Sequence, residues 1–240
     1  MKLIYIYHSC FALVGESFTV IIDYYKDSTC QSLEGVVHGE LLQRPGKLYV
    51  LSSHSHADHF NPEILRWKKQ HPDIQYIFSK DILENGLAGE HDACYLSKGE
   101  TWSDELLKVE AFGSTDLGIS FLLELEGKLI FHAGDLNNWH WKEESTGEEI
   151  QEAENAFFVE LDSIARRTGR MDLVMFPVDP RLGEDYMLGA RQFVEYFQVG
   201  IFVPMHFDEK YACANAFREY AEKRGVNFVE LTYRGEEINI

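Results

Sequence analysis

The sequence predicts an α/β (α+β) protein built as a four-layer αββα sandwich, with two mixed sheets face to face and helices outside. Three observations predict this class. Short apolar runs fill the first quarter of the chain, a second group of such runs lies between residues 106 and 132, and strands and helices alternate through the last third. Two facing sheets with outer helices cover the apolar faces of all these elements. We expect residues 1–240 to form a single domain, because sandwiches of this length often do.

The first quarter of the chain consists of apolar and β-branched runs that end at turn residues. A hairpin turn at Gly15-Glu16 separates two of these runs. Asn61 is expected to cap a helix in which Pro62, at the first helical position, loses no hydrogen bond. The expected strands are Lys2 to Tyr7, Cys10 to Val14, Ser17 to Asp23 and Lys47 to Ser52, and the helix after Asn61 reaches Gln70.

The remaining elements follow from periodicity and turn residues. Glu126-Gly127 predicts a tight hairpin turn, and Thr146 with Glu149 predicts a capping box at the start of a long helix. The expected strands are Ile74 to Phe78, Ala93 to Leu96, Leu106 to Phe112, Gly118 to Leu125, Lys128 to His132, Leu173 to Phe176, Ile201 to Pro204, Asn227 to Leu231 and Glu236 to Ile240. The expected helices are Lys80 to Asn85, Gly147 to Arg167, Glu184 to Phe197 and Tyr211 to Arg224.

The net charge of −18 excludes partners that need a basic surface. Phosphate binding depends on clustered Lys and Arg, so we expect neither nucleic acid nor a membrane as a partner. No run approaches the roughly 20 apolar residues of a membrane span, and no secretion signal is visible, so we expect a cytoplasmic protein. Cys10, Cys30, Cys94 and Cys213 form no CxxC spacing and are expected to be buried, reduced thiols.

Three histidines and an aspartate lie within residues 54–59, shortly after the run Lys47 to Ser52. A loop rooted at a buried strand end is held rigidly, which favours chemistry. His54 and His56 are two residues apart and can turn toward one ion, whereas the adjacent Asp58 and His59 can reach a second point. A solvated, histidine-rich turn is the ordinary alternative, and three imidazoles with a carboxylate at this spacing argue against it. The cluster therefore predicts a site for two divalent ions.

The segment His54-Ser55-His56-Ala57-Asp58-His59 resembles the HxHxDH signature of the metallo-β-lactamase fold superfamily. Gly134-Asp135 is similar to the family element whose aspartate bridges two metals, and Met205-His206 is similar to the family's last histidine. Asp23 resembles the aspartate that braces the histidine loop, although a strand-end turn residue is an equally good interpretation of it alone. The resemblance spans nearly the full chain through these fragments, and it implies the metallo-β-lactamase fold.

Within the superfamily, the sequence is most similar to the branch that contains ascorbate-6-phosphate lactonase and related phosphodiesterases. The fragments His8-Ser9-Cys10-Phe11, Phe131 to Asp135 and Pro204 to Phe207 carry this likeness. The family pattern implies two sets of metal ligands. One ion takes Asp58, His59, Asp135 and His206, and the other takes His54, His56 and the shared Asp135.

The pattern breaks where the family has a further histidine ligand, just before the expected strand Gly118 to Leu125. Residues 112–118 contain no histidine, so the first ion lacks one ligand. Asp116 is our first choice of replacement, because a carboxylate is an acceptable ligand for Zn²⁺, Mn²⁺ or Fe²⁺. His140 is the second choice, and Ser114 is a weaker candidate. A first site without a replacement is the remaining interpretation, in which Ser114 to Asp116 is an ordinary polar turn.

These features predict a metal-dependent hydrolase with one or two divalent ions per chain, Zn²⁺ before Mn²⁺ or Fe²⁺. A bound ion lowers the pKa of its water from 15.7 to about 7, and the hydroxide so formed is the expected nucleophile. Asp58 or Asp135 orients that hydroxide, and the expected substrate is a small ester, lactone or phosphodiester. The sequence does not indicate the oligomeric state.

Three further side chains are candidates for contact with the substrate. Arg181 can grip a carboxylate or phosphate through its fork of donors, although pairing with a surface acid is its ordinary alternative. His8 and His140 can donate hydrogen bonds, and each is also interpretable as a structural histidine. A rival function of another class is a non-catalytic metal- or ligand-binding sensor or scaffold of the same fold with an incomplete first site. Metal-dependent turnover distinguishes the two functions.

Overall fold

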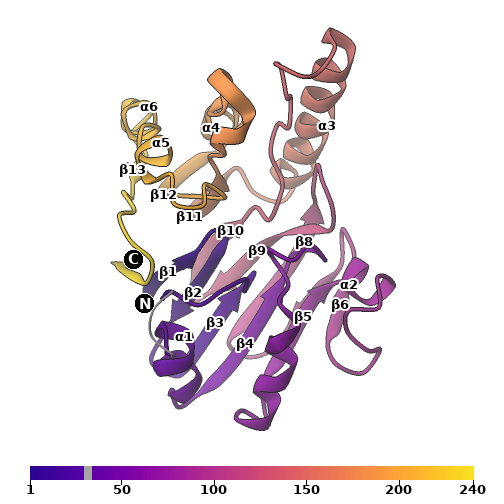
Figure 1. Ribbon diagram of the computed structural model, residues 1–240, viewed down its shortest axis with the longest axis vertical. Coiled ribbons are helices and arrows are strands. Elements are labelled where there is room, and N and C mark those ends of the chain that lie inside the picture. Colours follow the sequence, from indigo (N-terminus) through magenta and orange to yellow (C-terminus); the bar gives the residue numbers. More distant parts are fainter. Residues whose placement is uncertain (30–33) are drawn as a thin grey trace. The chain divides into compact units, whose positions relative to one another are not determined.

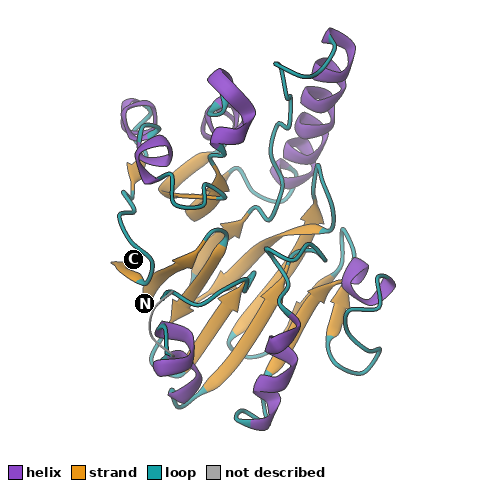
Figure 2. Cartoon of the chain, viewed as in Figure 1, coloured by secondary structure: helices purple, strands orange, loops and turns teal. Residues whose placement is uncertain are grey.

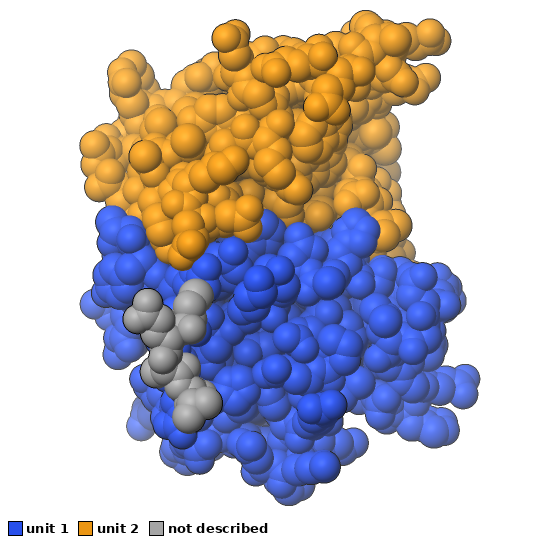
Figure 3. Space-filling model, viewed as in Figure 1, with its two compact units in different colours: residues 1–96, 232–240 blue, residues 97–231 orange. Residues whose placement is uncertain are grey.

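The computed structural model describes residues 1–29 and 34–240. The chain divides into two compact units, coloured separately in Figure 3: unit 1 comprises Met1–Leu96 and Thr232–Ile240, and unit 2 comprises Ser97–Leu231. Each unit contains a mixed β-sheet and helices of its own (Figure 1, Figure 2). The predicted α/β class with two mixed sheets is confirmed. The expectation of a single domain stays a prediction.

Unit 1 is built on a sheet whose strand order, among the described residues, is β14-β1-β2-β3-β4-β5-β6. Neighbours from β14 to β3 are antiparallel, and neighbours from β3 to β6 are parallel. The strands are β1 (Lys2–Tyr7), β2 (Cys10–Val14), β3 (Phe18–Ile22), β4 (Lys47–Ser52), β5 (Gln75–Ser79), β6 (Cys94–Leu96) and β14 (Glu236–Asn239). The helices are α1 (Val36–Gly39), η1 (Leu41–Gln43), η2 (Pro62–Lys69) and α2 (Lys80–Glu84).

Strand β4 positions the histidine loop. It pairs with β3 on one side and β5 on the other, and every residue after Lys47 is buried. A parallel strand covered on both faces is a continuous apolar run, which explains why the sequence predicts its limits correctly. The backbone N–H of Asp23, just after β3, donates to the Leu51 carbonyl of β4 at 2.9 Å. The chain therefore enters the loop from a strand that is fixed on both sides.

Unit 2, all of whose residues are described, has the strand order β13-β12-β11-β10-β9-β8-β7. Neighbours from β13 to β10 are parallel, and neighbours from β10 to β7 are antiparallel. The strands are β7 (Thr101–Ser103), β8 (Leu107–Gly113), β9 (Ile119–Leu125), β10 (Lys128–His132), β11 (Arg170–Pro177), β12 (Gln198–Met205) and β13 (Asn227–Phe228). The helices are α3 (Gly147–Ala165), η3 (Pro180–Asp185), α4 (Leu188–Tyr196), α5 (Tyr211–Asn215) and α6 (Arg218–Lys223).

Aromatic rings join the helices of unit 2 to its parallel strands. Phe193 of α4 lies 4.6 Å from the ring of Phe176 in β11 and 5.5 Å from that of Phe131 in β10. Phe157 of α3 lies 6.2 Å from Phe176. These four rings are fully buried, and tilted or stacked pairs at such distances add to the free energy gained by burial. The strands β10 and β11, which lead to the candidate site, are therefore held by a well-packed core.

Two predicted helices differ from the structure. The helix expected from Glu184 to Phe197 is wrong in its first turn, because α4 begins at Leu188 and η3 precedes it. Gly183 interrupts η3 with φ 78°, a conformation that a glycine adopts without steric cost. The helix expected from Tyr211 to Arg224 is divided into α5 and α6. Ala216, at the division, keeps right-handed helical angles of φ −62° and ψ −20°, so the backbone direction changes little between α5 and α6.

The smallest elements were not predicted. The strand β7 and the short helices α1 and η1 span three or four residues each, too few to show a periodic pattern. The prediction for the cysteines is correct for Cys10, which is buried, but wrong for Cys94, which is exposed, and Cys30 lies outside the described residues. Among the residues that the structure describes, no helix is both long enough and apolar enough to cross a membrane.

The capping box predicted for α3 is confirmed and can be tested. The Thr146 hydroxyl accepts from the Glu149 N–H at 3.3 Å, and the Glu149 carboxylate accepts from the Thr146 N–H at 2.7 Å. We expect Thr146→Ala to lower the free energy of unfolding by about 1 kcal/mol, since the exposed N-terminus of the helix loses its cap. Urea denaturation measures this loss. Glu152→Ala, an exposed change inside the same helix, is the control, and an equal effect of both would contradict the assignment.

Candidate metal centre

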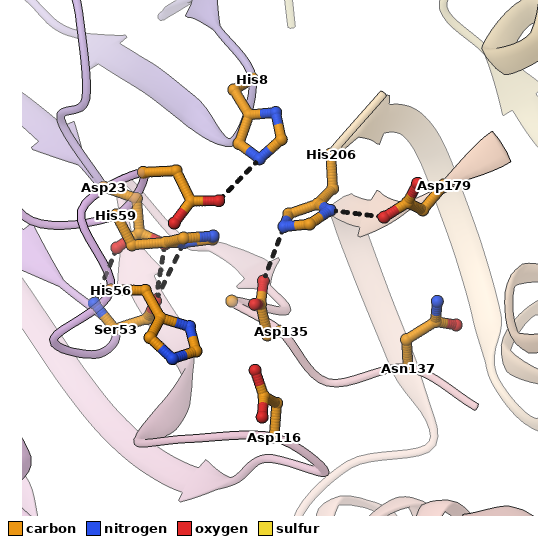
Figure 4. Close-up of polar contacts among 12 residues, drawn as sticks. His8, Asp23, Ser53, His56, His59, Asp116, Asp135, Asn137, Asp179 and His206 are labelled. Atoms are coloured by element: carbon orange, nitrogen blue, oxygen red, sulfur yellow. Dashed lines mark hydrogen bonds and ion pairs between the residues drawn. The ribbon is translucent and has the colours of Figure 1, made fainter. Parts of the chain in front are cut away.

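The histidine loop of unit 1 is braced by a buried aspartate. Asp23 follows β3 with φ 52°, a left-handed conformation that aspartate tolerates better than most residues. Its carboxylate accepts from the Ser53 N–H at 2.7 Å and from the Ser53 hydroxyl at 2.6 Å. It lies 2.7 Å from Nδ1 of His59, and both side chains are fully buried. Figure 4 shows these contacts. A carboxylate at Nδ1 fixes the tautomer and leaves the Nε2 lone pair of His59 for a metal.

His54 and His56 present two ring nitrogens to the same point. Nδ1 of His54 donates to the Ser53 hydroxyl at 3.0 Å, because that hydroxyl gives its own proton to Asp23. Nε2 of His54 lies 3.0 Å from Nδ1 of His56. His54 is fully buried and His56 is exposed. The spacing of the two nitrogens suits two ligands of one ion, as the sequence predicts.

A second group in unit 1 consists of His8, Asp58 and His59. Each offers a ligand atom, and these atoms lie within 4.8 Å of one another. Nε2 of His8 lies 3.3 Å from a carboxylate oxygen of Asp58. Asp58 and His59 were predicted as ligands of one ion. His8 was predicted only as a substrate contact, so its place beside them is new.

In unit 2, the candidate ligands follow two strands of the parallel part of the sheet. Asp135 comes after β10 and His206 directly after β12, and the strand between them, β11, leads to Asp179. The carboxyl ends of parallel strands meet at one edge of a sheet, which is where α/β proteins place their ligands. Nε2 of His206 lies 3.3 Å from a carboxylate oxygen of Asp135 (Figure 4). Both side chains are buried.

Asp179 braces His206 as Asp23 braces His59. Its Oδ2 lies 2.9 Å from Nδ1 of His206, and both side chains are 2% exposed. Arg181 donates from Nε to both oxygens of Asp179, at 3.0 and 2.8 Å, and from Nη2 to Oδ2 at 2.5 Å. Burial raises the pKa of Asp179, but the hydrogen bonds from His206 and Arg181 outweigh it and lower that pKa to about 2. The carboxylate is therefore ionised wherever the protein is folded near neutral pH.

The Arg181 side chain is half exposed, at 52%. Its Nη2 also lies 3.2 Å from Nδ1 of His206, because both groups donate to the same oxygen of Asp179. The structure thus gives Arg181 a positioning role that the sequence did not predict. Its predicted contact with a substrate stays a prediction.

The residues considered for the missing ligand lie in different surroundings. Asp116 is exposed, and one of its carboxylate oxygens lies within 4.8 Å of one from Asp135. Its loop is tied to the loop after Asp135, because the Thr115 hydroxyl donates to the Asn137 carbonyl at 2.5 Å and accepts from the Asn137 N–H at 3.0 Å. This position favours Asp116 as the replacement.

His140 has backbone partners for both ring nitrogens. Its Nδ1 accepts from the Lys142 N–H at 3.2 Å, so its Nε2 carries the proton and donates to the Asp185 carbonyl at 3.3 Å. Burial lowers the pKa of His140, which agrees with a neutral ring. Binding an ion or a substrate would break one of these hydrogen bonds. A structural role therefore accounts for His140 better than either role considered for it from the sequence.

Sequence reasoning missed the roles of Ser53, Asp179 and Trp139. Ser53 links Asp23 to His54, Asp179 braces His206, and Nε1 of Trp139 donates to the Asp135 carbonyl at 2.8 Å. The signal for Asp179 was present, since it follows a parallel strand two residues before an arginine. Nothing in the sequence distinguishes Ser53 or Trp139 from packing residues.

The fold and these side chains define a metal-binding α/β protein, and comparison with known proteins gives its family. Residues 2–154 match the family described as the β-lactamase superfamily domain, and the chain belongs to that family. A UPF0173 metal-dependent hydrolase of Desulfitobacterium hafniense (strain Y51) is 22% identical over 219 residues, which cover 84% of this chain and 80% of the relative.

Solved structures agree in fold. Igni18, a metallo hydrolase from the archaeon Ignicoccus hospitalis, is similar with a TM-score of 0.70 and 17% identity, over 99% of this chain and 97% of that one. CmlA, a diiron β-hydroxylase from Streptomyces venezuelae, is similar with a TM-score of 0.68 and 15% identity, over all of this chain and 54% of that one. The predicted superfamily and fold are confirmed, and the relatives support the prediction of a metal-dependent hydrolase. The likeness to the lactonase branch stays a prediction.

The brace on His206 gives a prediction about metal affinity. Asp179→Asn keeps the size of the side chain but removes the charge that holds Nδ1 of His206. Outer-shell changes of this kind typically weaken metal binding 10- to 100-fold, and we expect a loss in that range. Equilibrium dialysis against Zn²⁺ or Mn²⁺ measures it. Asp185→Asn, which removes an exposed carboxylate paired with Lys142, is the matched control. Equal affinities of the two variants would show that Asp179 has no such role.

Proposed function

We propose that the chain is a metal-dependent hydrolase that acts on a small ester, lactone or phosphodiester. Unit 1 offers His54, His56, Asp58 and His59, and unit 2 offers Asp116, Asp135 and His206. The resemblance to the family pattern assigns these side chains to a centre of two ions. The observation that carries the proposal is that His59 and His206 are held in the same way. A buried carboxylate contacts Nδ1 of each ring, which leaves Nε2 for an ion.

The side chains fit divalent ions. Imidazole nitrogens and carboxylate oxygens are the ligands that Zn²⁺, Mn²⁺ and Fe²⁺ share in proteins. A buried carboxylate such as Asp135 costs free energy unless charge balances it, and a cation supplies that balance. When bound, the ions supply an activated water and polarise the bond to be cleaved.

The residues of the chain would then have separate roles in the reaction. Asp58 or Asp135 orients the attacking water as a hydrogen-bond acceptor, and Asp23 and Asp179 hold the imidazoles in place. A small ester, lactone or phosphodiester is the proposed substrate, because each has a carbonyl or phosphoryl centre open to attack by such a water. Arg181 is available to a negatively charged group of the substrate through its exposed face.

Turnover tests this function. The protein loaded with Zn²⁺ or Mn²⁺ is expected to hydrolyse bis-p-nitrophenyl phosphate or members of a lactone panel. His59→Ala and Asp135→Ala should each lower kcat/KM more than about 100-fold, since even changes outside the ligand shell cost up to that much. His91→Ala, which removes an exposed imidazole, is the control. Tight metal binding without turnover on any of these substrates would favour the non-catalytic sensor or scaffold.

Metal content tests the replacement ligand. We expect Asp116→Ala to lose one ion per chain relative to the wild type, because the first ion would keep only His54, His56 and the shared carboxylate. Elemental analysis after dialysis gives the count. Asp73→Ala, an exposed change elsewhere, is the control. A full load of two ions in the Asp116 variant would exclude it as a ligand.

A further inference from the structure

We propose that His8 is a metal ligand, binding through Nε2 the same ion as Asp58 and His59. The inference rests on the proposed metal centre and adds a ligand to it. The HxHxDH run does not include His8, which lies in the turn between β1 and β2. Its Nε2 nevertheless belongs to the group of ligand atoms of unit 1 that lie within 4.8 Å of one another.

The four histidine–carboxylate pairs of the proposed centre fall into two groups by distance. The two histidine–carboxylate pairs that serve as braces, His59 with Asp23 and His206 with Asp179, are 2.7 and 2.9 Å apart, as expected of charge-assisted hydrogen bonds. His8 and Asp58 are 3.3 Å apart, and so are His206 and Asp135, which were assigned as ligands. The His8–Asp58 pair belongs with the second kind.

The longer distance is compatible with a shared ion. Metal–ligand bonds of about 2.0–2.2 Å at tetrahedral angles place neighbouring ligand atoms about 3.4 Å apart. The 3.3 Å between Nε2 of His8 and the Asp58 oxygen matches that separation. The pair therefore fits two ligands of one ion.

The backbone holds His8 in this place. Its φ of 58° lies in the left-handed region, which histidine adopts more readily than most residues. The His8 N–H donates to the Tyr5 hydroxyl at 3.1 Å. The ring is buried at 5% exposure and lies 6.1 Å from the ring of Tyr7 and 6.3 Å from that of Tyr25. A ring confined in this way loses little entropy when it binds an ion.

The ring of His59 completes the arrangement. It lies 5.9 Å from the His8 ring at an interplanar angle of 77°. His59 has its Nδ1 on Asp23, so its coordinating nitrogen is Nε2, the same atom that His8 offers. Unit 1 then provides two nitrogens and one oxygen for this ion, a set that divalent transition metals accept.

The test uses the full chain loaded with Co²⁺ and proton NMR. Imidazoles bound to Co²⁺ give strongly shifted ring signals, which can be counted. The variant is His8→Asn, since asparagine tolerates the left-handed turn. The control is His91→Asn. We expect His8→Asn to lose the shifted signals of one imidazole. We also expect this variant to bind the Co²⁺ ion of Asp58 and His59 at least about 10-fold less tightly than the wild type does. The ion of His54 and His56 should stay bound and show that the chain is folded.

The outcomes separate this inference from the proposed function. If His8→Asn keeps every shifted imidazole of the wild type, His8 is not a ligand, even where the affinity falls through Asp58. That result overturns the inference and leaves the metal centre in place. If the wild type shows no shifted imidazoles in the presence of Co²⁺, the proposed metal centre fails and the inference fails with it.

Discussion

The hydrogen bond between a buried carboxylate and Nδ1 of a histidine is the interaction on which the site depends. It occurs in each unit, between Asp23 and His59 and between Asp179 and His206. A histidine without such a partner exchanges tautomers and rotates, and its affinity for a metal falls. Burying two carboxylates is unfavourable by itself unless each accepts several hydrogen bonds. Ser53 donates two of them to Asp23, and Arg181 donates to both oxygens of Asp179. The stability lost by burial is thus recovered in local hydrogen bonds that also orient the ligands.

The two units reach this arrangement by the same topology. In each sheet, within the part of the chain that the structure describes, a run of antiparallel neighbours is followed by a run of parallel neighbours. The aspartate follows one strand of a parallel pair, β3 or β11, and the histidine follows its neighbour, β4 or β12. Asp23 and His206 both take left-handed φ values, of 52° and 61°, which turn the chain sharply at the strand end. The repeat is one of structure, since the sequence shows none.

The sequence was informative where burial is uniform along an element. The limits of β1, β2, β4 and β10 are as predicted, because continuous apolar runs between turn residues leave one interpretation. The ligand types were informative for the same reason, since a strand end followed by histidines and carboxylates is uncommon in a packed core. The positions of α4 and β7 depend on contacts between residues that are distant in the sequence, and so does the proposed role of His8. The spacing of His8 and Asp58 in the sequence does not indicate that they are close. They come together because β1, β2, β3 and β4 are neighbours in one sheet.

The proposed replacement of a histidine ligand by Asp116 bears on the identity of the metal. The loop of Asp116 does not move independently of the loop of Asp135, because Thr115 bonds both the N–H and the carbonyl of Asn137. A close approach of α4 confines Asn137 in turn: a Cβ added at Gly189 would lie 1.9 Å from its side-chain oxygen. Unit 2 therefore presents Asp116 and Asp135 as a rigid pair of carboxylates.

An oxygen donor in place of a nitrogen makes the ligand set of the first ion harder and more negative. Carboxylates suit Mn²⁺ and imidazoles suit Zn²⁺ and Fe²⁺, so a set of two imidazoles and two carboxylates lies between them. With Asp116 as the proposed ligand, Mn²⁺ is a stronger competitor for the first ion than it would be with a third imidazole in that place.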